Sequence, residues 1–230
     1  MENSIEFKVS GRFALFTDPV TRIGGEKCSY HIPTYEALKG IAKSVYWKPT
    51  FTWVIDKVRV MRCIRTQGKS IKPLEYGGGN SLAIYTYLTD VEYQVQAHFE
   101  WNRFRDDMAR DRIDGKHFAV AKRMIERGGR RDIFLGTREC QGYVQPWSFG
   151  QEGGFYDNHG ELAFGLMFHG FDYPDETGRN HLYSRFWRPV MLNGVVAFAR
   201  PEECTIRKHV REMVPRPPKS VGLKEGGLAL

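Results

Sequence analysis

The sequence predicts an α+β protein: a ferredoxin-like (RRM-like) domain with a small antiparallel β-sheet appended to it. Alternating strands and amphipathic helices follow one another in the order strand, helix, strand, strand, helix, strand, which is the split pattern of that domain. A change after residue 150 to short aromatic segments predicts the appended sheet. The chain has 230 residues, 41% of them hydrophobic, and is long enough to bury a sizeable core.

The expected domain begins with a strand and a helix. Residues 5–15 alternate between apolar and polar side chains, as in a strand with one buried face. Pro33 and Thr34 then open a helix, because a threonine hydroxyl caps free backbone N–H groups at a helix N-terminus. Pro49 ends this helix and leaves Tyr46 in its last turn. Its apolar positions recur at helical spacing, at Leu38, Ile41, Ala42 and Val45.

The domain continues with two strands, a helix and a last strand. Residues 53–64 are rich in valine and isoleucine, and residues 91–101 alternate strictly, so both are predicted to be strands. A helix is expected at 115–127, with Asp114 as its N-cap. Residues 138–149 supply the last strand.

The C-terminal part is predicted to be a separate small sheet followed by a tail. Asn193 and Gly194 favour a tight hairpin between two short strands. The residues from about 215 onward are polar and rich in proline, and we expect them to be mobile. The expected division is therefore a ferredoxin-like RNA-binding and catalytic domain, an antiparallel subdomain and a flexible tail, at 1–149, 150–214 and 215–230.

Positive charge is concentrated in one segment. The formal net charge of the chain is +7, and residues 103–131 hold ten basic and five acidic side chains, a net charge of +5. Such a concentration is typical of a nucleic-acid surface, although a solvated helix face gives the same pattern. The side chains expected to bind RNA are Arg105, Arg110, Arg112, Lys122, Arg123, Arg127, Arg130 and Arg131.

The sequence indicates neither a membrane protein nor a metalloprotein. Its N-terminus lacks a signal peptide pattern and no apolar run is long enough to span a membrane, so we expect a cytoplasmic protein. The four cysteines form no CxxC pair, which favours reduced thiols over a zinc module. We expect no cofactor and no metal, and we interpret the scattered histidines as surface or packing residues: His31, His159, His169 and His181.

A candidate catalytic group lies at the start of the second helix, in Asp114-Gly115-Lys116-His117. A helix N-terminus attracts a phosphate, Lys116 adds positive charge, and His117 is able to transfer a proton near neutral pH. Metal-free RNA cleavage requires these parts, because the ribose 2′-OH must lose a proton and the phosphorane must be stabilised. Tyr85, Tyr87 and Tyr93 are possible stacking platforms for bases, but aromatic residues at alternating positions more often belong to a core.

These residues also carry a resemblance to a known family. Tyr46 within Ser44-Val45-Tyr46-Trp47-Lys48-Pro49, together with Gly115-Lys116-His117-Phe118, resembles the CRISPR-associated processing endoribonuclease of type I-C systems. This is subtype d of the fifth Cas family, within the RAMP superfamily. The resemblance extends through the glycine loop at 76–80 to the segment at 200–204.

The resemblance implies a function and partners. The family cleaves precursor CRISPR RNA in its repeat hairpin without a metal, leaving a 5′-hydroxyl and a 2′,3′-cyclic phosphate. It retains the 5′ handle of the mature crRNA and joins a type I-C surveillance complex (Cascade) with a backbone subunit and a large subunit, in antiviral defence. The family's catalytic tyrosine, lysine and histidine correspond here to Tyr46, Lys116 and His117. We expect His117 to transfer protons, Lys116 to stabilise the phosphate, and Tyr46 to position groups or transfer a proton, and the first two roles are interchangeable.

Two other functions compete with this one. The first is a non-catalytic scaffold that only binds the crRNA handle. The second is a metal-dependent DNA nuclease acting on duplex DNA, which the unspecific positive charge and the histidines also suit.

Overall fold

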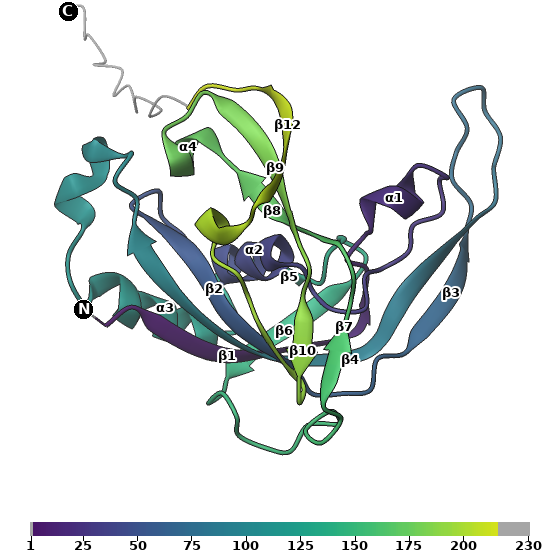
Figure 1. The fold of residues 1–230 in the computed structure, drawn as a ribbon, viewed down its shortest axis with the longest axis horizontal. Helices are drawn as coiled ribbons and strands as arrows, with labels where there is room; N and C mark the ends of the chain where they lie inside the picture. Colours follow the sequence, from purple (N-terminus) through teal and green to yellow (C-terminus); the bar gives the residue numbers. More distant parts are fainter. Residues whose placement is uncertain (1, 216–230) are drawn as a thin grey trace, which may run out of the picture.

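The computed structural model describes residues 2–215, so all but the first residue of the expected tail lies outside the described residues. Over that range the chain is a mixed α/β protein with mostly antiparallel sheets (Figure 1). One sheet has nine strands and the other has three. No helix in residues 2–215 is both long and apolar enough to cross a membrane.

The centre of the large sheet is formed by four strands in the order β6-β1-β4-β2. The strands are antiparallel, with Val9 opposite Tyr93 and with Val58 opposite Val95. In chain order these are the fourth, first, third and second strands of the expected pattern. Their bounds are β1 (Ser4–Ala14), β2 (Phe51–Val60), β4 (Ala83–Trp101) and β6 (Gln141–Pro146).

Two amphipathic helices pack against this sheet, α2 (Tyr35–Val45) and α3 (Lys116–Glu126). The expected cap of α2 is confirmed, since the Thr34 hydroxyl accepts a hydrogen bond from the Ala37 N–H at 3.1 Å. The expected cap of α3 is wrong. Its N-cap is Gly115, whose φ of 71° is a left-handed conformation that glycine adopts without strain, and no side chain caps the helix.

A long hairpin extends from the sheet on the side of the short helix α1 (Pro19–Arg22) (Figure 1). Its strands are the first half of β4 and β3 (Thr66–Ile71), which pairs with β4 from Thr66 opposite Leu88 to Ile71 opposite Ala83. Strand β3 is not predicted by the sequence pattern, because its side chains are mostly exposed and polar and do not alternate. The pattern predicts only the second half of β4, at 91–101.

The chain after residue 150 contributes to both sheets. Strand β11 (Val195–Ala197) pairs with β2 and so joins the large sheet, and β10 (Val190–Leu192) and β7 (Glu161–Ala163) follow it. The hairpin at Asn193 and Gly194 is confirmed, because both residues have positive φ angles between β10 and β11. The three-stranded sheet has the order β12-β9-β8, with β8 (Met167–Asp172), β9 (His181–Trp187) and β12 (Ile206–Glu212). The remaining elements are β5 (Ile133–Phe134), α4 (Pro174–Thr177) and the 3-10 helices η1 (Asp106–Asp111) and η2 (Pro201–Glu203).

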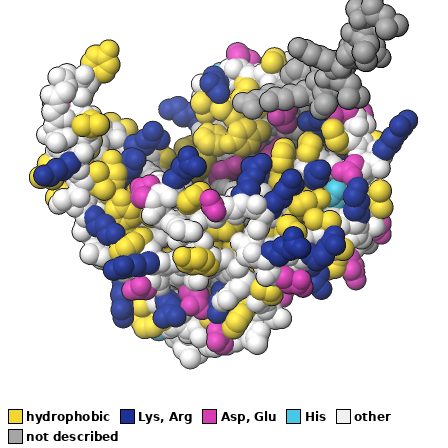
Figure 2. All heavy atoms as spheres, turned by 180° about the vertical axis from the view of Figure 1, so that it is seen from behind, with side chains coloured by type: hydrophobic (Ala, Val, Ile, Leu, Met, Phe, Trp, Pro, Cys, Tyr) yellow, Lys and Arg dark blue, Asp and Glu magenta, His cyan; other side chains and the backbone are white. Residues whose placement is uncertain are grey.

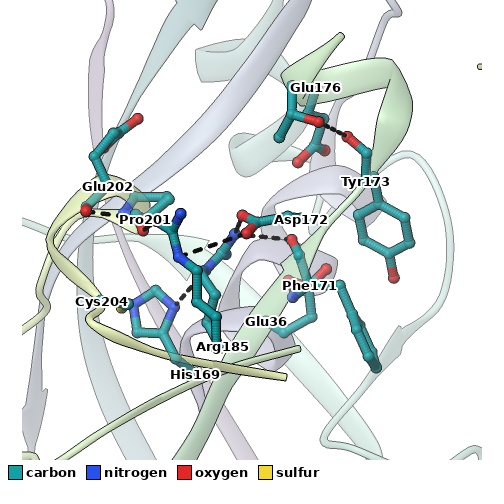
Figure 3. Close-up of polar contacts among 12 residues, drawn as sticks. Glu36, His169, Phe171, Asp172, Tyr173, Glu176, Arg185, Pro201, Glu202 and Cys204 are labelled. Atoms are coloured by element: carbon teal, nitrogen blue, oxygen red, sulfur yellow. Dashed lines mark hydrogen bonds and ion pairs between the residues drawn. The ribbon is translucent and has the colours of Figure 1, made fainter. Parts of the chain in front are cut away.

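Buried polar contacts connect the three-stranded sheet to α2. Lys39 of α2 is 2% exposed and its Nζ lies 2.5 Å from a carboxylate oxygen of Glu176 in α4. Figure 3 shows Arg185 of β9 between His169 and Asp172 of β8, with Nη1 donating hydrogen bonds to the Asp172 carboxylate and to the Phe171 carbonyl. The Phe171 N–H of β8 also donates to the Glu36 carboxylate of α2 at 3.3 Å, so polar contacts join α2 both to α4 and to β8.

Candidate active site

The candidate site lies where the C-terminus of α2 meets the N-terminus of α3. Tyr46 is the C-cap of α2, and His117 is the second residue of α3. The two residues are 71 positions apart in the chain, yet the Tyr46 hydroxyl lies 2.9 Å from His117 Nδ1. The structure thus brings together two of the three residues that the resemblance implied, and Lys116 adjoins them on α3.

Hydrogen bonding assigns the tautomer of His117. Its Nε2 lies 2.7 Å from the backbone carbonyl oxygen of Asp111. A carbonyl oxygen only accepts hydrogen bonds, so Nε2 carries a proton and donates it. In the neutral imidazole Nδ1 is then the acceptor, and the Tyr46 hydroxyl donates to it. The imidazole is therefore oriented to take the tyrosine proton.

Aromatic side chains enclose His117. Its side chain is 0% exposed, and its ring centroid lies 5.2 Å from that of Phe51 and 5.7 Å from that of Trp101. The Trp53 indole N–H donates a 2.7 Å hydrogen bond to the Tyr46 carbonyl and so holds the end of α2 in place. His117 is therefore enclosed, and both of its nitrogens are occupied by groups of the protein, the Tyr46 hydroxyl and the Asp111 carbonyl.

Asp111 organises the polar side of the site. Its carboxylate accepts a 2.7 Å hydrogen bond from the Thr50 hydroxyl and a short one from the Lys116 ammonium, and it lies 3.4 Å from His117 Nε2. The hydrogen bonds from Lys116 and Thr50 lower the pKa of the Asp111 carboxyl. The Lys116 side chain is 45% exposed and that of Asp111 is 28% exposed, so solvent reaches this side of the site.

Tyr46 is held in its neutral form. Burial raises its pKa, and the nearby Asp111 carboxylate raises it further, against a smaller opposite effect of Arg130. A neutral phenol accepts a proton from another hydroxyl only if it gives up its own. His117 Nδ1 is placed to receive that proton. Tyr46 and His117 are therefore suited to act as one proton-transfer unit.

The side chains expected to bind RNA divide into two groups. Arg105 and Arg112 are half-buried and bound within the protein: Arg105 pairs with Asp107 at 2.7 Å, and Arg112 donates to the Asn102 and Arg105 carbonyls. The remainder are exposed on or beside α3, at Arg110, Lys122, Arg123, Arg127, Arg130 and Arg131. Figure 2 shows that Lys and Arg are spread over the face seen from behind, interspersed with acidic and apolar side chains.

Arg130 and Arg131 lie beside the candidate catalytic pair. Their backbone N–H groups donate to the Ser44 carbonyl, and that of Arg130 also to the Val45 carbonyl, at the end of α2. The charge of Arg130 is close enough to lower the pKa of Tyr46. The sequence does not reveal three neighbours of the site, which are Thr50, Asp111 and Arg130. These residues lie far apart in the chain, and only the fold brings them together.

A cleft of about 660 Å³ opens next to the site, between the end of β4 and the three-stranded sheet. Trp101, whose ring packs on His117, is part of its wall. Its basic lining residues are Lys39, Arg103, Arg179, Arg185, Arg200 and Arg207. Arg103 and Arg179 are exposed at its edge. Acidic residues line it too, and they pair with Lys39, Arg185, Arg200 and Arg207, so Arg103 and Arg179 are the basic lining residues outside these ion pairs. The volume of the cleft is sufficient for a nucleotide.

The tyrosines considered as stacking platforms belong largely to the core. Tyr87 and Tyr93 are 3% and 2% exposed, and Tyr85 is half-buried against the core. His169 is fully buried, and desolvation together with the Arg185 charge lowers its pKa to about 3. Within residues 2–215, the one group of His, Cys, Asp and Glu side chains with the spacing of metal ligands lies away from this site, on β9 and β12.

Comparison with known proteins identifies relatives over most of the chain. A protein of Mannheimia succiniciproducens, named CRISPR pre-crRNA endoribonuclease Cas5d, is 28% identical over 226 residues, covering 85% of this chain and 95% of that protein. A protein of Thermus thermophilus with the same name is 26% identical over 195 residues, covering 80% of each. The crystal structure of a CRISPR-associated protein superposes with a TM-score of 0.76 at 38% identity, covering 89% of this chain and 96% of that one. The family model of the CRISPR-associated Cas5d proteins matches residues 4–199, and the chain therefore belongs to that family.

Proposed function

We propose that this protein is an endoribonuclease that cleaves precursor CRISPR RNA within its repeat, by attack of a ribose 2′-OH and without a metal. The observation that carries the proposal is the hydrogen bond from the Tyr46 hydroxyl to His117 Nδ1, beside Lys116 at the N-terminus of α3. The names of the Mannheimia and Thermus relatives support the same activity. The proposed products are a 5′-hydroxyl and a 2′,3′-cyclic phosphate.

The first proton transfer uses Tyr46 and His117 together. The 2′-OH proton passes to the Tyr46 oxygen while the Tyr46 proton passes to His117 Nδ1. The 2′-oxygen then bonds to phosphorus, and His117 becomes an imidazolium. Its second proton stays on Nε2, hydrogen-bonded to the Asp111 carbonyl, and the nearby Asp111 carboxylate stabilises the positive charge. The enclosed histidine thus acts on RNA through the tyrosine, and because Tyr46 is only 4% exposed, this step requires RNA binding to uncover its hydroxyl.

Lys116 completes the reaction on the phosphate side. Its ammonium stabilises the negative charge of the phosphorane, and the backbone N–H groups at the N-terminus of α3 add to this effect. As the bond from phosphorus to the 5′-oxygen breaks, Lys116 donates a proton to that oxygen. Solvent then returns a proton to Lys116 and accepts the extra proton of His117, which restores both residues. In the absence of RNA, Asp111 holds Lys116, so an incoming phosphate competes with Asp111 for the ammonium.

We propose that RNA lies across the exposed basic residues of α3 and that one flanking nucleotide enters the cleft beside Trp101. After cleavage the protein retains the 5′ handle and joins the backbone and large subunits of a type I-C surveillance complex. The order β6-β1-β4-β2, with two helices packed on the sheet, supports a ferredoxin-like core for this role.

The test is incubation of the purified protein with a 5′-labelled repeat hairpin in EDTA, beside the same RNA with a 2′-deoxy nucleotide at the cut site. Cleavage of the unmodified RNA alone is expected. Tight binding without cleavage in either lane would contradict the proposal and favour the handle-binding scaffold. Cleavage that requires a divalent ion, on RNA or on duplex DNA, would favour the metal-dependent nuclease.

A further inference from the structure

Three potential metal ligands meet on one face of the three-stranded sheet. In the pairing of β9 with β12, His181 lies opposite Glu212, and Tyr183 lies opposite His209. His209 and Glu212 are three positions apart, so in a regular strand they would point to opposite faces. A β-bulge between His209 and Arg211 adds one residue to β12 and brings both side chains to the face of His181.

The ligand atoms of these residues are already close together. One ring nitrogen of each histidine and one carboxylate oxygen of Glu212 lie within 4.8 Å of one another. His181 Nδ1 is 2.8 Å from Glu212 Oε2, and His209 Nε2 is 3.3 Å from Glu212 Oε1. Ligands on a tetrahedral ion with bonds of about 2.1 Å are roughly 3.4 Å apart, so small side-chain rotations suffice to close the site.

His181 Nδ1 makes no hydrogen bond within the described part of the chain. A Glu212 carboxylate oxygen lies 2.8 Å away but outside hydrogen-bonding geometry, and the nitrogen itself is covered although the His181 side chain is 44% exposed. A buried polar atom without a partner is costly and often marks an ion or water. Since Nδ1 faces a second imidazole and a carboxylate, a cation bound among the three groups would give it the partner that it lacks.

We infer that His181, His209 and Glu212 form a binding site for one transition-metal ion of the Zn²⁺ class. Imidazole nitrogens suit Zn²⁺, Co²⁺ and Ni²⁺, whereas Mg²⁺ prefers oxygen ligands throughout. Three protein ligands leave a position for water or for a group from a partner. The ring of Tyr183, 5.3 Å from that of His209, packs beside the ligands and limits their motion.

The ion would fasten β12 to β9. Strand β12 has only β9 as its partner among the described strands, and its side chains are mostly exposed, so little apolar burial holds it. A metal bond to each of the two strands supplies that attachment. The site belongs to the three-stranded sheet and shares no residue with the Tyr46, Lys116 and His117 group, so its role is separate from RNA cleavage.

The experiment is a titration of the full chain with Co²⁺, followed by visible d–d absorption and then by competition with Zn²⁺ and with Mg²⁺. We expect one equivalent of Co²⁺ to bind, Zn²⁺ to displace it and Mg²⁺ to leave it in place. The double substitution His181→Ala/His209→Ala should weaken binding by more than the roughly 10- to 100-fold that loss of an outer-shell partner costs. Glu212→Gln should weaken it in the same direction. The matched control is His31→Ala/His159→Ala, which removes two exposed histidines elsewhere and should bind like the wild type.

A second measurement tests the attachment of β12. In the wild type, Zn²⁺ should slow amide hydrogen exchange in residues 206–212 and leave exchange in residues 4–14 unchanged. In the double variant, Zn²⁺ should have no effect on either segment. The rate of RNA cleavage in EDTA should be the same for both proteins. Binding of equal affinity in the double variant, thiolate charge-transfer absorption from cysteine ligands, or no binding at stoichiometric Co²⁺ would each overturn the inference.

Discussion

The hydroxyl of Tyr46 donates its hydrogen bond to His117 Nδ1, 2.9 Å away, because the other ring nitrogen is already committed to the Asp111 carbonyl. The two side chains therefore act in series rather than independently. This relationship determines how substitutions at the site should behave.

The substitutions Tyr46→Phe and His117→Ala should each lower the single-turnover rate of RNA cleavage by about 10²- to 10⁴-fold, the usual contribution of general acid–base catalysis. Because they disable one proton path, the double variant should be hardly slower than either single variant. Repeat binding should remain nearly unchanged, since one side chain is a small part of a contact with many phosphates. His159→Ala, which alters an exposed histidine, is the control. Multiplicative losses in the double variant would show that the two groups act separately.

Lys116→Ala should be rescued by a modified substrate. If Lys116 protonates the departing 5′-oxygen, RNA with sulfur at that position should be cleaved by the variant much faster than ordinary RNA, because a thiolate leaves without a proton. A smaller deficit relative to the wild type should remain, because the variant also lacks the charge that stabilises the phosphorane. Tyr46→Phe should remain slow on the same RNA. Single-turnover rates on the two substrates provide the comparison, and an unrescued Lys116→Ala would restrict the lysine to binding the phosphate.

Reversing the charge of Arg123 and Arg127, on the exposed side of α3, should weaken RNA binding and reduce its dependence on salt. Each lost phosphate contact lowers the slope of log K against log salt by about 0.7 to 0.9. Binding isotherms at several salt concentrations measure the slope. Arg188→Glu changes an exposed arginine outside α3 and controls for net charge. A slope equal to that of the wild type would exclude Arg123 and Arg127 from the contact.

Acid should destabilise the protein through His169. Burial and the Arg185 charge lower its pKa to about 3, whereas an unfolded histidine titrates near about 6.5. Between these values the unfolded state binds the proton and the folded state does not. This contribution to the free energy of unfolding is therefore complete above about pH 6.5 and declines by about 1.4 kcal/mol per unit as pH falls toward 3. Urea unfolding between pH 7 and 4 should show a smaller decline for His169→Gln than for the wild type. Parallel curves would refute this assignment.

The buried pair of Lys39 and Glu176 should behave as a coupled unit. Burial raises the pKa of Glu176, but the ammonium groups of Lys39 and Lys43 outweigh this effect and lower it. Glu176→Gln leaves Lys39, 2% exposed, without its anion and should cost about 3 kcal/mol of unfolding free energy. Lys39→Met/Glu176→Leu should recover much of that loss. Denaturant unfolding, with the exposed Glu161→Gln as control, is the measurement.

Patterns along the sequence predicted the elements that have one buried face. Strand β1 and helix α2 followed their alternation and helical spacing closely, because burial imposes a strict period on apolar residues. The sequence pattern does not predict strand β3, because backbone pairing with β4 rather than burial of apolar side chains holds this strand in place. The boundary between the RNA-binding domain and the C-terminal subdomain, at residue 150, stays a prediction.

The site was predictable in its catalytic members but not in their surroundings. Tyr46, Lys116 and His117 were found through family resemblance and a helix N-terminus, and their catalytic roles remain predictions. The hydrogen-bond acceptor for His117 Nε2 is the backbone carbonyl of Asp111. Because every residue has such a carbonyl, the sequence does not reveal which one accepts this hydrogen bond. The metal-site candidate was missed because it depends on the bulge in β12, which changes which side chains share a face.

The pairing of β1 also has a consequence for biosynthesis. This strand, formed by the first residues of the chain, pairs on one side with β4 and on the other with β6, where Phe7 lies opposite Pro146. A growing chain therefore exposes an open edge of β1 until residue 146 has left the ribosome. Pairings of such long sequence separation form slowly, and open edges invite pairing with other chains. Truncation between β4 and β6 should accordingly yield aggregates rather than a smaller folded protein.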